Sequence, residues 1–307
     1  MPPTASARPV LVAVNPHAGS GRGARVGDRA VAALDAAGWT VMVLREENAE
    51  RLAAVVAEAL GSRPHALVVV GGDGMVSLGA GLVAGTDVPL GIVPCGTGND
   101  MARNLGLPVG NPDAALVRLV GAFERPPRRI DAARVTGADG RDAWFACALS
   151  AGFDAAVTER ANGMRRPRGA SRYVLALLRE IVAFGAVDYT LTVDGREERV
   201  PAVLVSVANA GSIGGGMRIA PDAALDDGEL DLLVVSPLSR LTFLRLFPRV
   251  FRGTHASLPQ VRLARARTVR IDAAGARKPI VAYADGERLG PLPVDIRVVP
   301  GALTVLA

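Results

Sequence analysis

Two short glycine-rich segments, each with an aspartate, carry the residue types that phosphate chemistry needs. They are Gly71-Gly72-Asp73-Gly74-Met75-Val76-Ser77 and Gly96-Thr97-Gly98-Asn99-Asp100, and each follows an apolar run. Glycines let a backbone approach anionic oxygens closely and present several N–H groups at once. An aspartate beside a phosphate is favourable only when a divalent cation lies between them, as Mg²⁺–nucleotide sites require. The segments therefore predict such a site, and a third segment, Asn15-Pro16-His17-Ala18-Gly19, is expected to join it.

The cation content excludes two large classes of nucleotide-binding protein. Lys278 is the only lysine among the 35 lysines and arginines, and it follows no glycine-rich segment. A P-loop and a protein-kinase ATP site each need a lysine at a defined place. Phosphate must then be held by backbone amides, arginine and a metal ion. The two cysteines, Cys95 and Cys147, make neither a disulfide framework nor a zinc site with only three histidines to help, so we expect free thiols.

The elements that must position these segments are a parallel sheet and its helices. Apolar runs at 10–14, 39–44, 66–70 and 90–93 alternate with helical periodicity over 26–34, 52–60 and 76–83. Such alternation is typical of a parallel sheet covered on both faces. Ligands of these sheets bind at the carboxyl ends of the strands, where all three segments lie.

Beyond Pro126-Pro127 the pattern changes to short strands separated by Gly, Pro and Asp turns. We expect helices there only over 171–183 and 239–247. The predicted strands are 130–135, 144–149, 189–193, 203–208, 230–235, 269–271, 280–284 and 296–299. The predicted fold class is therefore α/β plus β. A parallel α/β domain covers 1–127, an antiparallel β-rich domain covers 128–295, and 296–307 is a candidate to return to the first domain.

Charge is concentrated in one stretch of the second domain. Residues 232–271 contain eight arginines and no Asp or Glu, whereas the whole chain has a net charge of +5. Within that stretch, 238–252 interleaves Leu and Phe with Arg, although Pro248 must bend or end any helix. A basic amphipathic segment of this kind suits an anionic membrane interface, and the alternative is a solvated arginine face over an apolar contact. No run reaches the ~18–20 apolar residues of a membrane span, so we expect a cytoplasmic, peripherally membrane-associated protein.

Four motifs together resemble the diacylglycerol kinase catalytic-domain family, which includes bacterial lipid kinases, sphingosine kinases and ceramide kinases. They are Asn15-Pro-x-x-Gly19, Gly71-Gly-Asp-Gly74, Pro94-x-Gly-Thr-Gly-Asn-Asp100 and Asp285-Gly286-Glu287, in the family's order and over almost the full chain. The resemblance implies a nucleotide-binding domain of phosphofructokinase/NAD-kinase type, a C-terminal β-sandwich domain and an active site in the cleft between them. It also implies phosphorylation of a lipid hydroxyl by ATP with Mg²⁺.

The resemblance also implies roles for particular residues. Residues 15–19, 72–77 and Thr97 are similar to the family's nucleotide shell, and Asp73 and Asp100 to the acidic pair that organises Mg²⁺–ATP. Asp285 and Glu287 resemble the acids beside the acceptor hydroxyl, one of them the general base, and i, i+2 spacing on a strand would put both on one face. A structural Mg²⁺ is implied at Asp227, with the carbonyls of Ala224 and Glu229; the alternative is a plain Asp-Gly turn.

The chain departs from the family pattern at three places. Met75 stands where a Thr is usual, Leu78 stands near the place of a usual Glu, and no Thr occurs around Arg45-Glu46. These departures concern nucleotide affinity and specificity more than the class of reaction.

Two other functions stay open from the sequence. An NAD kinase shares Gly71-Gly-Asp-Gly74 but phosphorylates a soluble dinucleotide, whereas the motifs at Asn15-Pro16 and 96–100 favour a lipid kinase. A catalytically inactive lipid- or nucleic-acid-binding module is the second. Aromatic residues make up only 4% of the chain, so there is little to stack on bases and we expect no nucleic-acid partner. The expected partner is a lipid substrate at an anionic membrane surface, and the sequence leaves a homodimer open.

Overall fold

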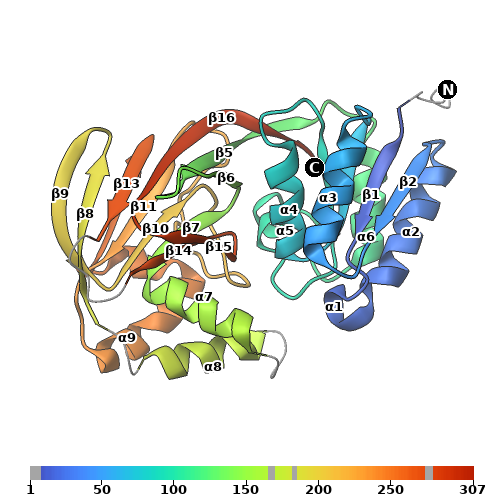
Figure 1. Ribbon diagram of the computed structural model, residues 1–307. Coiled ribbons are helices and arrows are strands. Elements are labelled where there is room, and N and C mark those ends of the chain that lie inside the picture. Colours follow the sequence, from blue (N-terminus) through green and yellow to red (C-terminus); the bar gives the residue numbers. More distant parts are fainter. Residues whose placement is uncertain (1–7, 165–169, 182–184, 274–278) are drawn as a thin grey trace. The chain divides into compact units, whose positions relative to one another are not determined.

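The computed structural model describes residues 8–164, 170–181, 185–273 and 279–307. The chain divides into two compact units, one formed by Met1–Ile130 with Gly301–Ala307 and the other by Asp131–Pro300 (Figure 1). Each unit has a sheet-based core of its own.

The first unit is built on a parallel sheet. Its strands lie in the order β2 (Val41–Arg45), β1 (Val10–Val14), β3 (Ala66–Gly71) and β4 (Leu90–Pro94). All side chains of β1, β3 and β4 are buried, which is why these strands are uninterrupted apolar runs. The last residues of the long strand β16 (Val294–Leu306) pair in parallel with β4.

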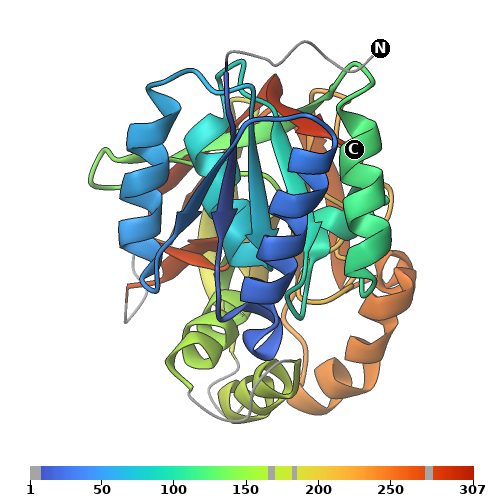
Figure 2. The same cartoon turned by 90° about the vertical axis from the view of Figure 1, so that its right-hand side faces the viewer.

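Helices cover both faces of this sheet (Figures 1 and 2). On one face, α2 (Gly23–Ala36) and α6 (Pro112–Ala122) pack with alternate residues of β1 and β3 in one apolar cluster. Against the other face lie α3 (Ala49–Leu60) and α4 (Asp73–Val83). Two short helices, α1 (Ala18–Gly21) and α5 (Asp100–Asn104), stand at the carboxyl ends of β1 and β4.

The second unit is a sandwich of two antiparallel layers. One is a six-stranded sheet in the order β12 (Val261–Ala266), β11 (Leu230–Val235), β10 (Leu204–Ala208), β7 (Ala148–Gly152), β14 (Val281–Ala284) and β15 (Glu287–Pro291). In the other layer, the first half of β16 pairs with β13 (Thr268–Asp272), followed by β8 (Val187–Val193) and β9 (Arg196–Ala202). Strand β5 (Arg128–Thr136) pairs with β6 (Asp142–Phe145). Side chains of both layers, such as Tyr189 and Val205, share one apolar core.

Helical segments cover the outer face of the six-stranded sheet. These are α7 (Phe153–Gly163), α8 (Ala170–Glu180) and α9 (Arg240–Leu246), followed by the 3₁₀ turns η1 (Phe247–Arg252) and η2 (Thr254–Ser257). An apolar cluster joins α7, α8 and α9 to β10 and β11.

The α/β plus β fold class is confirmed, and several predicted elements need correction. The predicted strand 144–149 is two strands, β6 and β7, because the backbone of Ala146 and Cys147 bonds to a distant aspartate instead of continuing a ladder. The helix predicted over 239–247 ends at Leu246, and a 3₁₀ turn containing Pro248 follows. Within the helix predicted over 171–183, α8 ends at Glu180, and 182–183 lie outside the described residues. Strands β9, β12 and β15 and helices α1, α5, α6 and α7 were not predicted.

Candidate functional site

Three loops meet at the carboxyl edge of the parallel sheet in the first unit. They follow β1, β3 and β4, which are neighbours in the sheet. A Cβ atom placed on Gly96 would lie 2.3 Å from the Cα of Gly72, and one on Gly19 would lie 2.1 Å from the carbonyl oxygen of Cys95. Real Cβ atoms do not come that close, so the loops touch backbone to backbone and these two positions accept only glycine.

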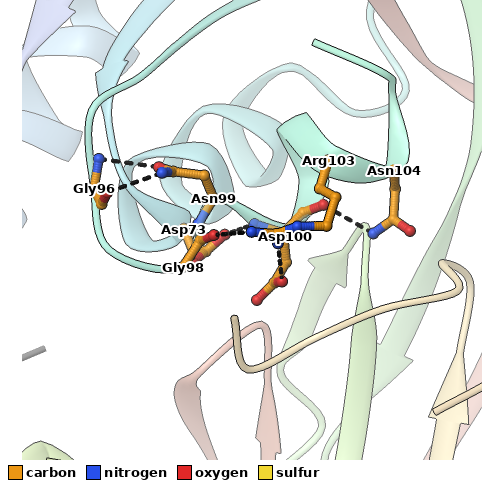
Figure 3. A network of polar contacts seen from close by, with 7 residues as sticks. All are labelled: Asp73, Gly96, Gly98, Asn99, Asp100, Arg103 and Asn104. Atoms are coloured by element: carbon orange, nitrogen blue, oxygen red, sulfur yellow. Dashed lines mark hydrogen bonds and ion pairs between the residues drawn. The ribbon is translucent and has the colours of Figure 1, made fainter. Parts of the chain in front are cut away.

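Asp73 connects two of these loops through backbone hydrogen bonds (Figure 3). Its Oδ2 accepts the N–H of Asn99 at 2.8 Å, and its Oδ1 accepts the N–H of Asp100 at 2.6 Å. Asn99 has a left-handed backbone with φ of 56°. Its side-chain amide accepts from the N–H of Gly96 at 3.0 Å and donates to the carbonyl of Gly96 at 2.8 Å, which closes the loop. The conformation of the loop after β4 is therefore fixed by Asp73 from outside and by the Asn99 side chain from within.

The carboxylates of Asp73 and Asp100 both lie next to Gly98. A Cβ on Gly98 would be 2.1 Å from Oδ2 of Asp73 and 3.5 Å from Oδ2 of Asp100. Burial raises the pKa of Asp73, and the charge of Asp100 raises it further, against the effect of the amide donors and of Arg103. Arg103 also bonds Oδ1 of Asp100 at 2.6 Å and the carbonyl of Gly98 at 3.0 Å.

This donor set fits a magnesium ion. Two neighbouring carboxylates, one of which raises the pKa of the other, form a site of excess negative charge, and their oxygens are the ligands that Mg²⁺ prefers. Among the described residues there is no cluster of three or more His, Cys, Asp or Glu side chains that would hold a metal alone. Asp73 and Asp100 would then supply the protein ligands, and nucleotide phosphates and water the others.

The second group of predicted residues lies at one end of the six-stranded sheet. Ala284, the last residue of β14, pairs with Leu149 near the start of β7. Ala148, the first residue of β7, pairs with Ala208, the last residue of β10. Ala208 in turn pairs with Asp231 at the start of β11. Residues that follow β14 and β10, or that precede β7 and β11, are therefore gathered at the same edge.

Asp285 holds the segment that precedes β7. Its carboxylate accepts three consecutive backbone N–H groups, from Ala146 at 2.8 Å and from Cys147 and Ala148 at 2.9 Å each. Asp285 and Gly286 have positive φ values of 47° and 86° and form the two-residue turn between β14 and β15. The prediction that Asp285 and Glu287 share one face of a strand is therefore wrong, because a type I′-like turn at Asp-Gly separates them. Glu287 is the first residue of β15 and is exposed.

Asn209 binds the carbonyl groups of the same segment, and this residue was not predicted from the sequence. Its side-chain amide donates to the carbonyls of Ala146 and Asp131, both at 2.9 Å, and its backbone N–H donates to Cys147 at 2.8 Å. Only 1% of Asn209 is exposed. An Asn directly after a buried apolar strand and just before a glycine loop was the signal that could have identified it.

The segment predicted to hold a structural metal contacts an arginine. Arg265 Nη1 lies 3.2 Å from Oδ2 of Asp227 and 3.3 Å from Oε2 of Glu229. Asp227 Oδ1 also accepts the N–H of Glu229 at 3.1 Å, which forms a turn after Ala224. Burial raises the pKa of the neighbouring Asp231; Arg265 opposes this and the nearby Asp227 charge adds to it. The guanidinium provides positive charge at the place where the sequence predicts a cation.

Comparisons with known proteins agree over almost the whole chain. Residues 9–135 match the diacylglycerol kinase catalytic domain, and residues 147–307 match the YegS C-terminal NAD kinase beta sandwich-like domain. A protein from Mycobacterium tuberculosis named diacylglycerol kinase is 40% identical over 298 residues, 97% of this chain and 94% of the relative. One from Stenotrophomonas maltophilia named "Probable lipid kinase YegS-like" is 31% identical over 80% of both chains.

The chain belongs to the diacylglycerol kinase family. It is a lipid kinase, so the predicted enzyme class is confirmed. The crystal structure of a diacylglycerol kinase from Bacillus anthracis shares its fold, with a TM-score of 0.72 at 23% identity over 97% of this chain and 96% of the other. Among the described residues, no helix of this lipid kinase combines the length and hydropathy needed to cross a bilayer.

The remaining predicted nucleotide residues of the lipid kinase differ in accessibility. His17 and Thr97 are exposed on the loops, and Gly74 is exposed in the first turn of α4. Asn15 shapes its loop, since its Oδ1 accepts the N–H of His17 at 2.9 Å. Pro16, Ala18, Gly72 and Ser77 are half-buried and Gly71 is buried.

Met75 and Val76 were predicted to belong to the nucleotide shell, but their side chains are in the core and only 5% exposed. A Cβ on Gly71 would lie 2.3 Å from Cγ of Met75, so Met75 packs under the strand end. Their N–H groups bond the carbonyl of Gly72 in the first turn of α4. The methionine that replaces the family's usual threonine is therefore a core contact.

Proposed function

We propose that this lipid kinase transfers the γ-phosphoryl group of ATP to the hydroxyl of a diacylglycerol-like or sphingoid membrane lipid, with Mg²⁺. The products are the lipid phosphate, ADP and one proton, which leaves the acceptor hydroxyl. The observation that carries the proposal is the pairing of Asp73 and Asp100 where three glycine-containing loops meet.

At the nucleotide end, phosphate oxygens would be held by the loop backbone. Gly72 is the N-cap of α4, an 11-residue helix that begins at Asp73 and whose N-terminal amides favour anions. Bound Mg²⁺ would neutralise phosphate charge there. Asp73 keeps the loops in register through its bonds to Asn99 and Asp100, and Arg103 keeps the Asp100 carboxylate in place.

At the acceptor end, Asp285 and Glu287 have different surroundings. Both oxygens of Asp285 accept backbone N–H groups, so this residue orients the 146–148 segment. Glu287 is exposed at the start of β15, two residues away. Glu287 is therefore the acid better placed to accept the proton of the lipid hydroxyl, and Asp285 fixes the turn that presents it.

The proposal is tested by incubating the protein with labelled ATP, Mg²⁺ and a mixed lipid extract, and then identifying the labelled species. Label in a lipid phosphate that requires both Mg²⁺ and Asp73 supports it. If label enters only a soluble dinucleotide, the NAD-kinase alternative replaces it. If nothing is labelled while the protein still binds lipid, it is a non-catalytic binding module.

A further inference from the structure

The eight arginines between residues 232 and 271 have different surroundings, which the sequence does not distinguish. Three that lie on strands are used in ion pairs within the fold. Arg262 pairs with Glu198, Arg265 with Asp227 and Glu229, and Arg270 with Asp295. These three charges are partly neutralised and contribute little to attraction of an outside partner.

The arginines on α9 and η1 differ from these. Within the part of the chain that the structure describes, no acidic side chain lies within ion-pair distance of Arg245, Arg249 or Arg252. All three are exposed, and Arg245 and Arg249 line an open hollow of about 410 Å³ together with Leu241. One 13-residue segment, residues 240–252, therefore carries three positive charges that are not neutralised by described acidic side chains.

The same segment exposes large apolar side chains. Leu241 is 80% exposed, Phe251 51% and Leu244 37%, and neither α9 nor η1 has a buried residue. Leu241, Leu244 and Arg245 have i, i+3 and i+4 spacing, so they share one face of α9. We call Leu241, Leu244, Arg245, Arg249, Phe251 and Arg252 the α9–η1 surface.

The opposite side of the segment is fixed to the protein. Phe243 makes an edge-to-face contact with Phe153 of α7 at a ring distance of 5.1 Å. Phe247 lies 5.6 Å from Phe243, and Phe251 lies 6.1 Å from Phe247. A row of rings therefore runs from the apolar cluster under α7 to the exposed Phe251. In Figure 1, α9 lies with α7 and α8 on the same side of the second unit.

We propose that the α9–η1 surface docks on an anionic lipid bilayer, with Leu241, Leu244 and Phe251 in the interface and the three arginines on lipid phosphates. Unneutralised arginines beside exposed leucine and phenylalanine match an interface that is negatively charged outside and apolar beneath. Because the acceptor of the proposed reaction is a membrane lipid, the docking rests on that function and explains how the enzyme reaches its substrate.

Binding to vesicles tests the docking without any need for activity. Phosphatidylcholine vesicles with and without phosphatidylglycerol are sedimented with the wild-type protein and with two variants, R245Q/R249Q/R252Q and L241S/F251S. At about fivefold in binding per basic residue, the triple variant should lose at least tenfold in affinity for the anionic vesicles. The second variant should also bind less, and added salt should weaken the wild type.

Helix α6 of the first unit offers a matched control. Val117 there is 76% exposed, and Arg118 beside it is exposed as well, so V117S/R118Q removes the same kinds of group elsewhere. This variant should bind like the wild type. If it loses binding equally, or if R245Q/R249Q/R252Q binds anionic vesicles like the wild type, the proposal is wrong. Circular dichroism checks that each variant is folded.

A short-chain, water-soluble acceptor separates docking from catalysis. R245Q/R249Q/R252Q should phosphorylate it at the wild-type rate and lose turnover only on bilayer-embedded lipid. An equal loss of turnover on both acceptors would mean that the arginines support catalysis or the fold, and it would overturn the docking proposal. Absence of turnover in the wild type, with the vesicle results as expected, would refute the proposed reaction and leave the docking surface standing.

Discussion

Asp73 and Asp285 show two uses of the same arrangement, a carboxylate that accepts consecutive backbone amides. Asp73 accepts the N–H groups of Asn99 and Asp100, and the second carboxylate, that of Asp100, lies at the same glycine. Asp285 accepts three N–H groups, and the other acid of its motif, Glu287, is exposed. Paired carboxylates concentrate negative charge for a cation, whereas a carboxylate surrounded by amides fixes a backbone. Local surroundings therefore assign different roles to two aspartates in similar Asp-Gly motifs.

The largest effect is expected at Asp73. Asp73→Asn removes a charge from the cation site and turns an NH₂ group toward a backbone N–H, so kcat/KM should fall by about 10³-fold or more. The lost acceptor should also cost about 1–3 kcal/mol of folding free energy. Calorimetry of Mg²⁺–ATP binding and thermal melts measure the two effects. Unchanged Mg²⁺–ATP affinity would remove Asp73 from the site.

The raised pKa of Asp73 gives this prediction a pH dependence. A carboxyl whose pKa is higher in the folded state stabilises the fold below its unfolded pKa, and this contribution is lost as pH rises through the folded value. The wild-type protein should therefore lose this stability as pH rises over that window, and D73N should not.

Glu287→Gln and Asp285→Asn together sharpen the comparison at the acceptor end. Glu287→Gln should lower kcat by about 10²-fold, the usual range for an acid–base group, with no change in the melting temperature. Asp285→Asn should lower both, because its NH₂ group would oppose one of the three N–H donors, at a cost of about 1–3 kcal/mol. Steady-state kinetics and thermal melts measure both variants. A fully active E287Q enzyme would return the role of base to Asp285.

Asn209→Ala should give a smaller loss. Two carbonyls, those of Ala146 and Asp131, lose their donors, at about 1–3 kcal/mol of folding free energy. Because the 146–148 segment would lose the side-chain donor at its Ala146 carbonyl and keep only Asp285 and the backbone bonds to Cys147, kcat should fall about tenfold while KM for ATP stays unchanged. Kinetics with varied ATP separate this positioning effect from general damage, which would alter both constants.

The smallest effect is expected at Arg265. This arginine is half-exposed, and loss of its ion pairs with Asp227 and Glu229 should cost about 1 kcal/mol or less. If Asp227 and the carbonyls of Ala224 and Glu229 hold Mg²⁺ once the guanidinium is gone, added Mg²⁺ should restore the melting temperature of Arg265→Gln. No response to Mg²⁺ would leave the segment as a plain turn.

The sequence predicted elements whose cause is local and missed those whose cause is distant. Strand β1 has the predicted bounds because five consecutive side chains are buried. Strand β9 is half charged, and its place depends on the hairpin with β8. The break between β6 and β7 depends on Asp285, more than 130 residues later. The turn at Asp285-Gly286 could have been predicted, since Asp-Gly is a hairpin signal. The prediction that placed Asp285 and Glu287 on one strand did not take this signal into account.

In the candidate site, too, features with a local cause could be predicted and features that depend on distant contacts could not. Convergence of the loops after β1, β3 and β4 could be expected from the adjacency of parallel strands. The clamp of Asn99 on Gly96, the inward turn of Met75 and the bonds of Asn209 could not, because each depends on backbone geometry that spacing alone does not contain.

Strand β16 makes the first unit discontinuous in sequence. Its residues Val294–Arg297 pair with β13, whereas Val305 and Leu306 pair with β4, and Gly85 donates its N–H to the carbonyl of Ala302 at 2.7 Å. Leu303 and Val305 are fully buried. A fragment that stops near residue 130 would lack this strand and leave the edge of β4 unpaired and apolar, a surface prone to aggregation. To study the first unit alone, the terminal heptapeptide has to be supplied, by a linker or by circular permutation. In the ribosome-bound chain, this unit is complete only after residues 301–307 have been made.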